Sequence, residues 1–250
     1  MADSPKPVVG ATPEGVQDRQ QAADAVREMF TSIAPRYDLL NHLLSFNIDR
    51  LWWRRAARSF RHILQRPGAR SLDLCCGTGD MAFALARVAG KQAEIVGADF
   101  SHAMLARAVQ KSRGTPLQWL EADALHLPVS DAGFDLVTSA FGFRNLADYD
   151  AGLREIFRVL RPGGEIGILD FGEPKGMIGR CYRVYFKRIL PAIGAVISGV
   201  KGPYAYLPVS VERFPSPNEM LDRMRAAGFT DVSWTPYTFG IAGLYRGRKS

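Results

Sequence analysis

The segment Ser71–Asp80, which reads SLDLCCGTGD, constrains the fold of this chain most strongly. Ser71–Leu74 predicts a buried strand that carries an acid, and Gly77 and Gly79 predict a tight turn into an apolar helix. A glycine turn between a strand and a helix lets a ligand approach bare backbone. Asp99, which follows 20 residues after Gly79, ends a second predicted strand, where a carboxylate can bind both hydroxyls of a ribose. Together these features predict a site for a nucleotide-type cofactor.

The acids around the turn narrow the choice of cofactor. The glycine spacing is compatible with a dinucleotide fingerprint, whose third glycine would fall at Ala82, and also with a turn that only shapes the chain. Asp80 stands at the predicted helix N-cap, where its carboxylate would repel a pyrophosphate. S-adenosylmethionine has no phosphate and carries an ammonium and a sulfonium, which suit the carboxylates of Asp73 and Asp80. We therefore expect S-adenosylmethionine at this turn.

The composition is that of one globular domain. Of 250 residues, 47% are hydrophobic and 23% charged, which is enough to bury a sizeable core. Residues 1–20 are rich in Pro, Gly, Asp and Gln, so we expect a disordered tail there and a single domain over residues 21–250. We see no signal peptide and no apolar run of the ~18–20 residues that span a bilayer. The three cysteines lack disulfide or metal-ligand spacing, so we expect a cytoplasmic protein without a bound metal.

A basic stretch stands out against this background. The net charge is +7, and residues 50–70 carry seven arginines and no acid. Leu51–Arg66 predicts an amphipathic helix, with Trp53, Ala57, Phe60 and Leu64 on one face and Arg50, Arg54, Arg58 and Arg61 on another. A solvated face is the default interpretation, and nucleic acid or an anionic membrane are the alternatives. Because such a helix with tryptophans can lie on anionic lipid, peripheral contact with the inner face of the plasma membrane is a hypothesis.

Strands and helices alternate through the centre of the chain. We predict strands at Ser71–Leu74, Glu94–Ala98, Leu117–Glu121, Phe134–Ser139 and Glu165–Asp170, with helices at Asp80–Ala89, Ala103–Lys111 and Asp150–Leu160. Arg161–Gly164 predicts a turn after the last of these helices. The alternation predicts a parallel sheet with helices on both faces, whose ligands collect at the carboxyl ends of the strands. Gly77–Gly79, Asp99, Asp123 and Ala140–Asn145 all follow predicted strands and should converge there.

Further segments flank this core on both sides. Helices are predicted at Ala22–Ile33 and Tyr37–Leu44, within an N-terminal helical lid over residues 21–66. Residues 171–215 form an apolar, aromatic insertion after the fifth strand. A helix at Asn218–Ala227 and strands near Phe229–Thr235 and Gly240–Arg246 follow. The fold class is therefore α/β, with a seven-stranded, mostly parallel, Rossmann-like sheet.

Several motifs resemble those of one enzyme family. The most specific are Tyr37-Asp38, the block Phe141-Gly142-Phe143-Arg144-Asn145, and Tyr204-x-Tyr206-Leu207. The turn Gly77-Thr78-Gly79-Asp80 is a further marker, whereas Pro162-Gly163-Gly164 is common to many methyltransferases. From about Val26 to Lys249 the chain resembles the ubiquinone/menaquinone biosynthesis C-methyltransferases.

This resemblance implies a class I methyltransferase fold and methyl transfer from S-adenosylmethionine to a ring carbon of a prenylated hydroquinone. It favours demethylmenaquinol as the substrate, with a benzoquinol of ubiquinone biosynthesis as the alternative. By matching position, Thr78, Asp99, Asp123 and Ala124 contact the cofactor, and Ala140 stands where some members have a serine contact. Together with the residues of the turn, the expected cofactor residues are Asp73, Gly77, Thr78, Gly79, Asp99, Asp123, Ala124 and Ala140. Cys75 and Cys76 replace a pair that is commonly Ala-Gly, and we expect them to pack behind the cofactor.

Four residues are candidates for catalysis: Arg144, Asn145, Tyr37 and Asp38. Carbon is a poor nucleophile, so the site needs a proton acceptor and groups that hold the oxyanion formed when a quinol hydroxyl is deprotonated. Arg144 and Asn145 suit the oxyanion, because an adjacent cation lowers the pKa of a phenol. Tyr37 and Asp38 could close over the cofactor or accept the proton. A purely structural alternative is that Arg144 pairs with Asp148 or Asp38.

Other interpretations remain open at this point. An RNA methyltransferase would suit the charge of +7, but no RNA-binding domain is evident, so we expect no nucleic-acid partner. A non-catalytic subunit of a quinone-synthesis complex would keep the fold, but the intact turn, Asp99 and Arg144-Asn145 argue against it. The apolar insertion would serve as a groove for the prenyl tail, as a packing cap or as a homodimer interface.

Overall fold

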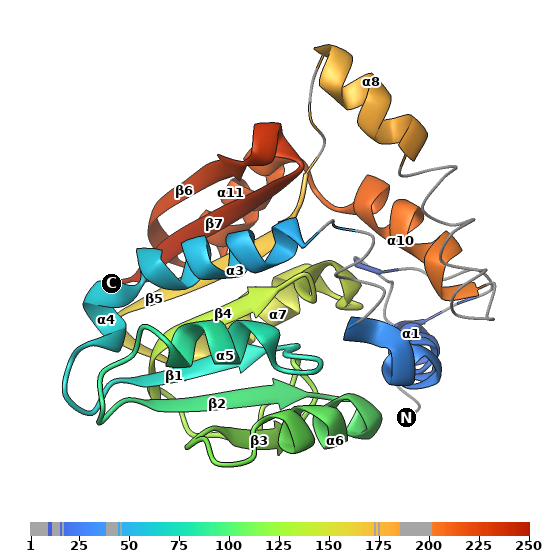
Figure 1. Cartoon of the computed structure of the whole chain (residues 1–250). Coiled ribbons are helices and arrows are strands. Elements are labelled where there is room, and N and C mark those ends of the chain that lie inside the picture. Colours follow the sequence, from blue (N-terminus) through green and yellow to red (C-terminus); the bar gives the residue numbers. More distant parts are fainter. Residues whose placement is uncertain are drawn as a thin grey trace, which may run out of the picture.

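Seven strands form one mixed sheet in the part of the chain that the computed structural model describes, residues 10–11, 16, 18–38, 45, 47–172, 174, 176–185 and 202–250. The strand order is β3-β2-β1-β4-β5-β7-β6 (Figure 1). The strands are β1 (Arg70–Leu74), β2 (Glu94–Asp99), β3 (Gln118–Glu121), β4 (Phe134–Ala140), β5 (Leu160–Phe171), β6 (Phe229–Tyr237) and β7 (Ala242–Lys249). The first five are parallel, and β7 is antiparallel to both of its neighbours. The predicted seven-stranded, mostly parallel sheet is confirmed.

The centre of the sheet sets the position of the site. Strand β1 lies between β2 and β4, with Leu72 in register with Val96 on one side and Val137 on the other. The chain runs from β1 outward to β2 and β3 and then crosses back to β4, so strand order reverses between β1 and β4. A crevice at such a reversal, outside the carboxyl ends of the strands, is where ligands bind in open α/β sheets.

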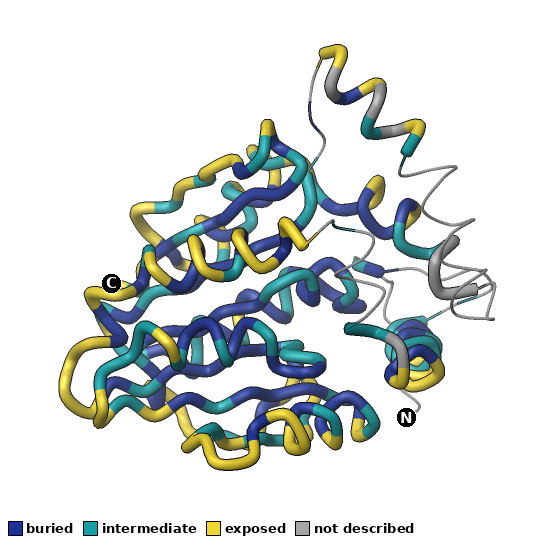
Figure 2. Tube along the Cα trace, in the orientation of Figure 1, coloured by how far each residue is buried: buried dark blue, intermediate teal, exposed yellow. Residues whose placement is uncertain are grey.

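Helices cover both faces of this sheet, as Figure 1 shows. The helices of the sheet layers are α3 (Ile48–Ser59), α4 (Arg61–Leu64), α5 (Asp80–Ala86), α6 (His102–Lys111), α7 (Tyr149–Val159) and α11 (Pro217–Ala226). One apolar cluster packs α3, α4 and α5 on the sheet, and another packs α7 and α11. Figure 2 shows the central strands buried along most of their length between these layers. Burial on both faces explains why these strands are almost continuously apolar.

The N-terminal segment and the insertion lie beyond the carboxyl ends of the strands (Figure 1). They contain α1 (Arg19–Ile33), η1 (Ala34–Arg36), α8 (Gly176–Val184) and α10 (Gly202–Arg213). Asp18 caps α1 by accepting a hydrogen bond from the Gln21 N–H. Ile33, Met104 and Val211 bring α1, α6 and α10 into one apolar cluster. None of the helices within the described ranges is long and apolar enough to cross a membrane.

Three local differences from the sequence-based expectation have physical causes. The expected helix Leu51–Arg66 breaks at Phe60, whose ring fills the space that a side chain at Gly167 would occupy. In this helix Trp52 is the buried tryptophan, and the expected Trp53 is only half-buried. The expected turn at residues 161–164 is instead the start of β5, with Gly163 in the left-handed region (φ 78°) next to an irregularity in the pairing with β4.

Two other expectations fall largely outside the described ranges. Most of the expected tail, residues 1–20, lies outside the described ranges. Residues 10–11 are described, and the Ala11 N–H donates a hydrogen bond to the Leu146 carbonyl (2.8 Å), which places these two residues against the loop after β4. Residues 39–44 of the expected helix Tyr37–Leu44 also lie outside, while Tyr37 and Asp38 continue from η1. The tail and domain boundaries stay predictions.

Additional short 3-10 segments are η2 (Phe143–Asn145) and η4 (Thr238–Gly240). They follow β4 and β6, respectively, and so lie at the edge of the sheet where the candidate site is built.

Candidate active site

A cavity of about 340 Å³ opens at the carboxyl ends of the parallel strands. Its walls come from the ends of β1, β2 and β4 and from α1, α3, α8 and α10. Ten predicted site residues line it: Tyr37, Asp73, Gly77, Thr78, Asp99, Asp123, Ala124, Ala140, Arg144 and Asn145. The predicted residues Gly79 and Asp38 are not among its lining residues.

Asp73 brings a buried carboxylate to one end of the cavity. Its Oδ1 accepts a hydrogen bond from the Thr138 hydroxyl of the neighbouring strand (2.9 Å). Its Oδ2 is buried and has no hydrogen-bond partner among the described residues. Burial raises the pKa of Asp73 to about 7, because desolvation outweighs the bond from Thr138. A buried carboxylate oxygen without a partner, on the wall of a cavity, is a place for a cationic ligand.

Asp99 holds the glycine turn in position. Its Oδ2 accepts a hydrogen bond from the Gly77 N–H (2.8 Å), and its Oδ1 accepts one from the Ser101 N–H (2.9 Å). Burial raises the pKa of Asp99 to about 6, although these backbone hydrogen bonds act to lower it. Gly77 takes a left-handed φ of 56°, and its bare backbone lines the cavity. The acid and the glycine predicted from their spacing are therefore in direct contact.

Gly79 packs beneath the turn and does not line the cavity, and its role in cofactor binding stays a prediction. It is the N-cap of α5 in a left-handed conformation (φ 90°), and a Cβ there would lie 2.4 Å from the Trp119 ring. The glycine is thus needed for close packing under the turn. Asp80, expected at the N-cap, is instead the first residue of the helix, and its carboxylate is ion-paired with Lys111 (2.9 Å). Lys111 therefore offsets part of the negative charge of Asp80, which also lines the cavity.

Lys111 joins the lid to the glycine turn. Its Nζ donates to Asp38 Oδ2 (3.0 Å), Thr78 Oγ1 (3.1 Å) and Asp80 Oδ1 (2.9 Å). Asp38 Oδ1 also accepts a hydrogen bond from the Thr78 hydroxyl. Both carboxylate oxygens of Asp38 therefore accept hydrogen bonds in the free protein, and its role as a proton acceptor stays a prediction. Lys111, which sequence reasoning missed, connects α6, the turn and the lid.

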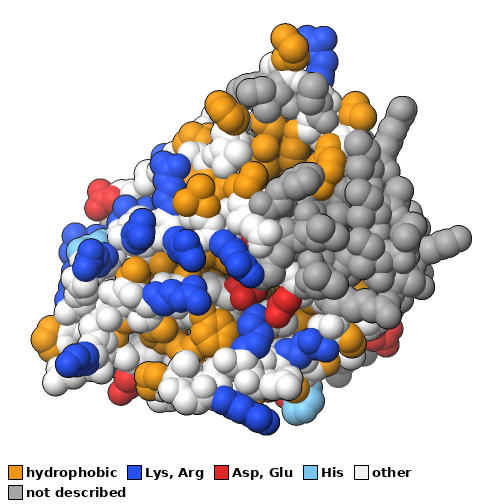
Figure 3. Space-filling model, in the orientation of Figure 1, with side chains coloured by type: hydrophobic (Ala, Val, Ile, Leu, Met, Phe, Trp, Pro, Cys, Tyr) orange, Lys and Arg blue, Asp and Glu red, His pale blue; other side chains and the backbone are white. Residues whose placement is uncertain are grey.

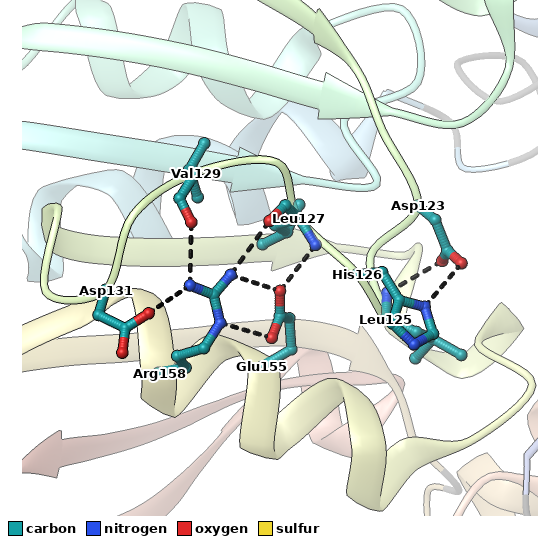
Figure 4. A network of polar contacts seen from close by, with 8 residues as sticks. All are labelled: Asp123, Leu125, His126, Leu127, Val129, Asp131, Glu155 and Arg158. Carbon is teal, nitrogen blue, oxygen red and sulfur yellow. Dashed lines mark hydrogen bonds and ion pairs between the residues drawn. The ribbon is translucent and has the colours of Figure 1, made fainter.

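The loop after β3 carries Asp123 and Ala124, both of which line the cavity. Figure 4 shows Asp123 with the residues that follow it in this loop. Asp123 accepts a hydrogen bond from the Leu125 N–H (2.9 Å), and Ala124 is buried. Further along, Arg158 of α7 donates to the carbonyls of Leu127 (3.1 Å) and Val129 (2.9 Å). The same guanidinium is ion-paired with Glu155 and Asp131, and Glu155 accepts a bond from the Leu127 N–H. A single arginine therefore fixes the path of the loop.

Arg144 lies at the other side of the cavity in a buried ion pair. Its Nη1 is 3.1 Å from Asp170 Oδ1 at the end of β5, and the same nitrogen donates to the Phe141 carbonyl. The backbone N–H of Arg144 donates to Asp170 Oδ2 (3.2 Å). The partner of Arg144 is thus Asp170, and neither Asp148 nor Asp38. Desolvation raises the pKa of Asp170, and the charge of Arg144 opposes that rise.

Polar atoms without partners surround this ion pair. Among the described residues, Arg144 Nε, Asn145 Oδ1 and the Tyr206 hydroxyl are buried and form no hydrogen bond. All three residues line the cavity, and burial raises the pKa of Tyr206 to about 12, with Arg144 close enough to oppose the shift. Buried polar groups are normally satisfied, so this cluster indicates a bound polar group. Sequence reasoning named Tyr206 only as a motif residue, and its place on α10 gave no signal for this role.

The remaining walls are apolar and aromatic. They include Trp52, Trp53, Phe141, Phe171, Tyr185 and Leu207. Cys75 and Cys76 line the cavity floor, and burial raises the pKa of both thiols, as expected for packing residues. The cavity can therefore hold a cationic, ribose-bearing ligand at the Asp73 end and an aromatic, partly apolar ligand beside Arg144.

Solved structures with the same architecture place the fold in a class. A SAM-dependent methyltransferase from Thermotoga maritima, described as a possible histamine N-methyltransferase, superposes with a TM-score of 0.62 at 20% sequence identity. The match covers 89% of this chain and 99% of that one. The fold is therefore of the Rossmann-like class to which this solved methyltransferase also belongs.

Sequence comparison is more specific. A profile of the ubiE/COQ5 methyltransferase family matches residues 16–249. Demethylmenaquinone methyltransferases from Deinococcus radiodurans and Thermus thermophilus are 50% and 52% identical, covering 94% and 88% of this chain and 96% and 100% of theirs. A ubiquinone/menaquinone biosynthesis C-methyltransferase from Geobacter sulfurreducens is 44% identical, over 92% of this chain and 90% of its own. The chain belongs to the ubiE/COQ5 methyltransferase family.

Proposed function

We propose that this protein transfers a methyl group from S-adenosylmethionine to a ring carbon of demethylmenaquinol. Two relatives of at least 50% identity carry the name demethylmenaquinone methyltransferase. The observation that carries the proposal is that one cavity has two polar ends. Within the described part of the chain, a carboxylate oxygen of Asp73 at one end and polar atoms around Arg144 at the other have no hydrogen-bond partner. A cationic methyl donor and a quinol need these two complementary ends in a single site.

The residues at the Asp73 end fit the methyl donor. The Oδ2 atom of Asp73, which has no hydrogen-bond partner in the described ranges, can accept a hydrogen bond from an ammonium. Asp99 can bind ribose hydroxyls while it holds Gly77. Asp123 and Ala124 would lie on the adenine side of this end, as expected from the family match. When bound, the donor supplies an electrophilic methyl group on a sulfonium. The protein contributes alignment and a site from which water is largely excluded.

The residues at the Arg144 end fit a quinol oxygen. Arg144 Nε and the Tyr206 hydroxyl are donors that have no partner among the described residues, and Arg144 carries a fixed positive charge. Together they would stabilise the quinolate that makes the neighbouring ring carbon nucleophilic. Asp170 fixes the guanidinium from behind through Nη1. Tyr37, which lines the cavity from the lid, would close the site over both ligands.

The apolar walls fit the prenyl tail. Tyr182, Tyr185 and Leu207 of the insertion line the cavity, next to Phe171. These side chains offer an apolar surface that excludes water. The insertion is therefore best explained as the part of the chain that receives the tail. A homodimer interface on its outer side stays a prediction.

A benzoquinol of ubiquinone biosynthesis is the second candidate substrate. The relative from Geobacter sulfurreducens is named for both ubiquinone and menaquinone biosynthesis. A benzoquinol lacks the second fused ring, so it would fill less of the aromatic end of the cavity. Membership of a quinone-modifying family makes an RNA methyltransferase the less favoured interpretation.

One assay tests this function. Purified protein is incubated with methyl-labelled S-adenosylmethionine and either demethylmenaquinol or the benzoquinol precursor, and the label is located in the product. We expect label on the ring carbon of the naphthoquinol, with lower kcat/KM for the benzoquinol. Absence of label in both quinols, with the donor still bound, would contradict the proposal.

A further inference from the structure

An exposed apolar tip stands at the edge of the cavity. Ile48 and Leu51, three residues apart on α3, are 36% and 61% exposed, and Phe239 in η4 is 77% exposed. The Trp52 Nε1–H donates to the Thr238 hydroxyl (2.8 Å), so the start of α3 and η4 lie side by side. Ile48, Trp52 and Thr238 all line the cavity, whereas Leu51 and Phe239 do not. The tip therefore borders the cavity on its outer side.

The backbone holds Phe239 in this exposed position. Thr238 and Phe239 have φ angles of 45° and 59°, in the left-handed region that residues other than glycine rarely adopt. Strain of this kind persists only where neighbouring structure fixes it, and it occurs most at functional sites. Here the Trp52 indole and the Ile241 N–H, which donates to the Thr238 carbonyl (3.1 Å), fix the turn. The turn thus presents an aromatic ring to the outside.

A basic stripe continues the exposed face of α3. Arg54 and Arg58 follow Leu51 at helical spacing, and both are exposed. Neither is engaged in an ion pair in the part of the chain that the structure describes, and Asp49, the acid of this helix, is buried. Figure 3 shows basic side chains running along the face that carries α3, with hydrophobic side chains beside them. The face is therefore apolar at the cavity edge and cationic behind it.

We propose that this face, made by Ile48, Leu51, Phe239, Arg54 and Arg58, docks on an anionic lipid bilayer. Apolar side chains next to unpaired arginines match the interfacial region, where acyl chains meet phosphate groups. Docking in this way turns the edge of the cavity toward the bilayer. This inference rests on the proposed function, which gives the docking its purpose. A prenylated quinol is dissolved in the membrane and has to enter the cavity from there.

Vesicle sedimentation with the full chain tests the assignment. The wild-type protein should sediment with vesicles of phosphatidylcholine and phosphatidylglycerol, less with phosphatidylcholine alone, and less again as salt rises. Each arginine at an anionic surface contributes about fivefold in affinity, so Arg54→Gln with Arg58→Gln should bind on the order of 30-fold more weakly. Leu51→Ser with Phe239→Ser should reduce binding to both kinds of vesicle. Arg54→Lys with Arg58→Lys keeps the charge and should keep the binding.

A control double variant uses exposed residues at α6, away from the proposed docking face. Val109 on α6 is 51% exposed, and Arg113 follows that helix, so Val109→Ser with Arg113→Gln removes the same side-chain types elsewhere. Binding that is unchanged in the face variants, equally reduced in the control, or absent in the wild type would overturn the proposal. Salt-sensitive binding of RNA without binding of vesicles would also overturn the proposal, and it would indicate that the arginines bind nucleic acid.

A separate readout keeps the two proposals distinguishable. Methyl transfer to a demethylmenaquinol analogue with a short tail, measured without vesicles, reports only on the proposed function. The face variants should keep wild-type turnover in this assay, because none of the four substituted residues lines the cavity. Failure of methyl transfer in the wild type would contradict the proposed methyltransferase function. The vesicle experiment would still test the proposed docking face independently.

Discussion

Arg144 and Asp170 form a buried ion pair that connects the loop after β4 to the end of β5. The side chains are 6% and 0% exposed, and the guanidinium Nη1 lies 3.1 Å from the carboxylate Oδ1. The Tyr149 hydroxyl, from α7, also donates to the Arg144 carbonyl (3.0 Å). These contacts fix the guanidinium on the cavity wall and leave Nε without a partner among the described residues. Asp170 is therefore a positioning residue for Arg144 in the candidate site.

Asp170→Asn should destabilise the protein and reduce turnover. Removing the carboxylate leaves the Arg144 charge buried and uncompensated, which costs about 3–5 kcal/mol of unfolding free energy. Urea denaturation measures this loss. The double variant Asp170→Asn with Arg144→Met should recover most of the stability and no activity. Recovery of turnover in the double variant would show that the pair has only a structural role.

The affinity for the methyl donor should depend on pH through Asp73. Burial raises the pKa of Asp73 in the free protein to about 7, so this carboxyl takes up a proton as the pH falls through that value. The donor's ammonium needs the ionised form, and donor affinity should fall by up to about tenfold for each pH unit below 7. Calorimetry between about pH 8 and about pH 5.5 measures this.

Asp73→Asn serves as the control for that profile. The amide cannot ionise, so the variant should bind the donor weakly at every pH, with a flatter profile. Asp99, whose pKa is raised to about 6 by burial, remains in the variant and would account for a residual slope at the acid end. A wild-type profile that is flat through pH 7 would contradict the assignment of Asp73 to the ammonium.

Arg158→Met should loosen the loop that carries Asp123 and Ala124. The substitution removes the hydrogen bonds to the Leu127 and Val129 carbonyls and leaves Glu155 without its cation. Donor affinity should fall several-fold, and stability should fall by roughly 1–3 kcal/mol. Calorimetry with S-adenosylmethionine and thermal unfolding measure the two effects.

Arg161→Met is a matched control for the loop. Arg161 also donates to a carboxylate and a carbonyl, those of Asp135 and Ala132, and both of these acceptors lie outside residues 123–129. Its loss should lower stability without weakening donor binding. Equal loss of donor affinity in the two variants would show that the loop is not the element that Arg158 controls.

The convergence of Asp73, Gly77 and Asp99 on one cavity was largely predictable from the sequence, because these residues lie close to strand ends. A strand, a glycine turn and an acid at the end of the next strand are enough to predict Asp73, Gly77 and Asp99 as cofactor residues. Their convergence follows from the parallel sheet alone. The individual role of each residue was less predictable: Gly79 packs on Trp119 instead of lining the cavity.

The quinol end was only partly predictable, because it depends on contacts between distant segments. The motif pointed to Arg144, but its partner Asp170 lies 26 residues further along the chain, in β5. Helical or sheet periodicity does not identify such a pair. Tyr206 reaches the cavity from the insertion, where an apolar pattern is equally compatible with a packing cap. The break at Phe60 between α3 and α4 likewise depends on a distant residue, because the Phe60 ring occupies the space that a side chain at Gly167 would fill.

The most direct test of this account compares donor binding with turnover in two variants. The central claim is that one cavity has a donor end at Asp99 and a separate quinol end at Arg144. Asp99→Ala should weaken S-adenosylmethionine binding by about 1.5–3 kcal/mol in calorimetry. Arg144→Ala should leave that affinity within about twofold of wild type and lower the turnover of demethylmenaquinol by on the order of 100-fold or more. Unchanged turnover in Arg144→Ala, or an equal loss of donor affinity in both variants, would contradict the two-ended site.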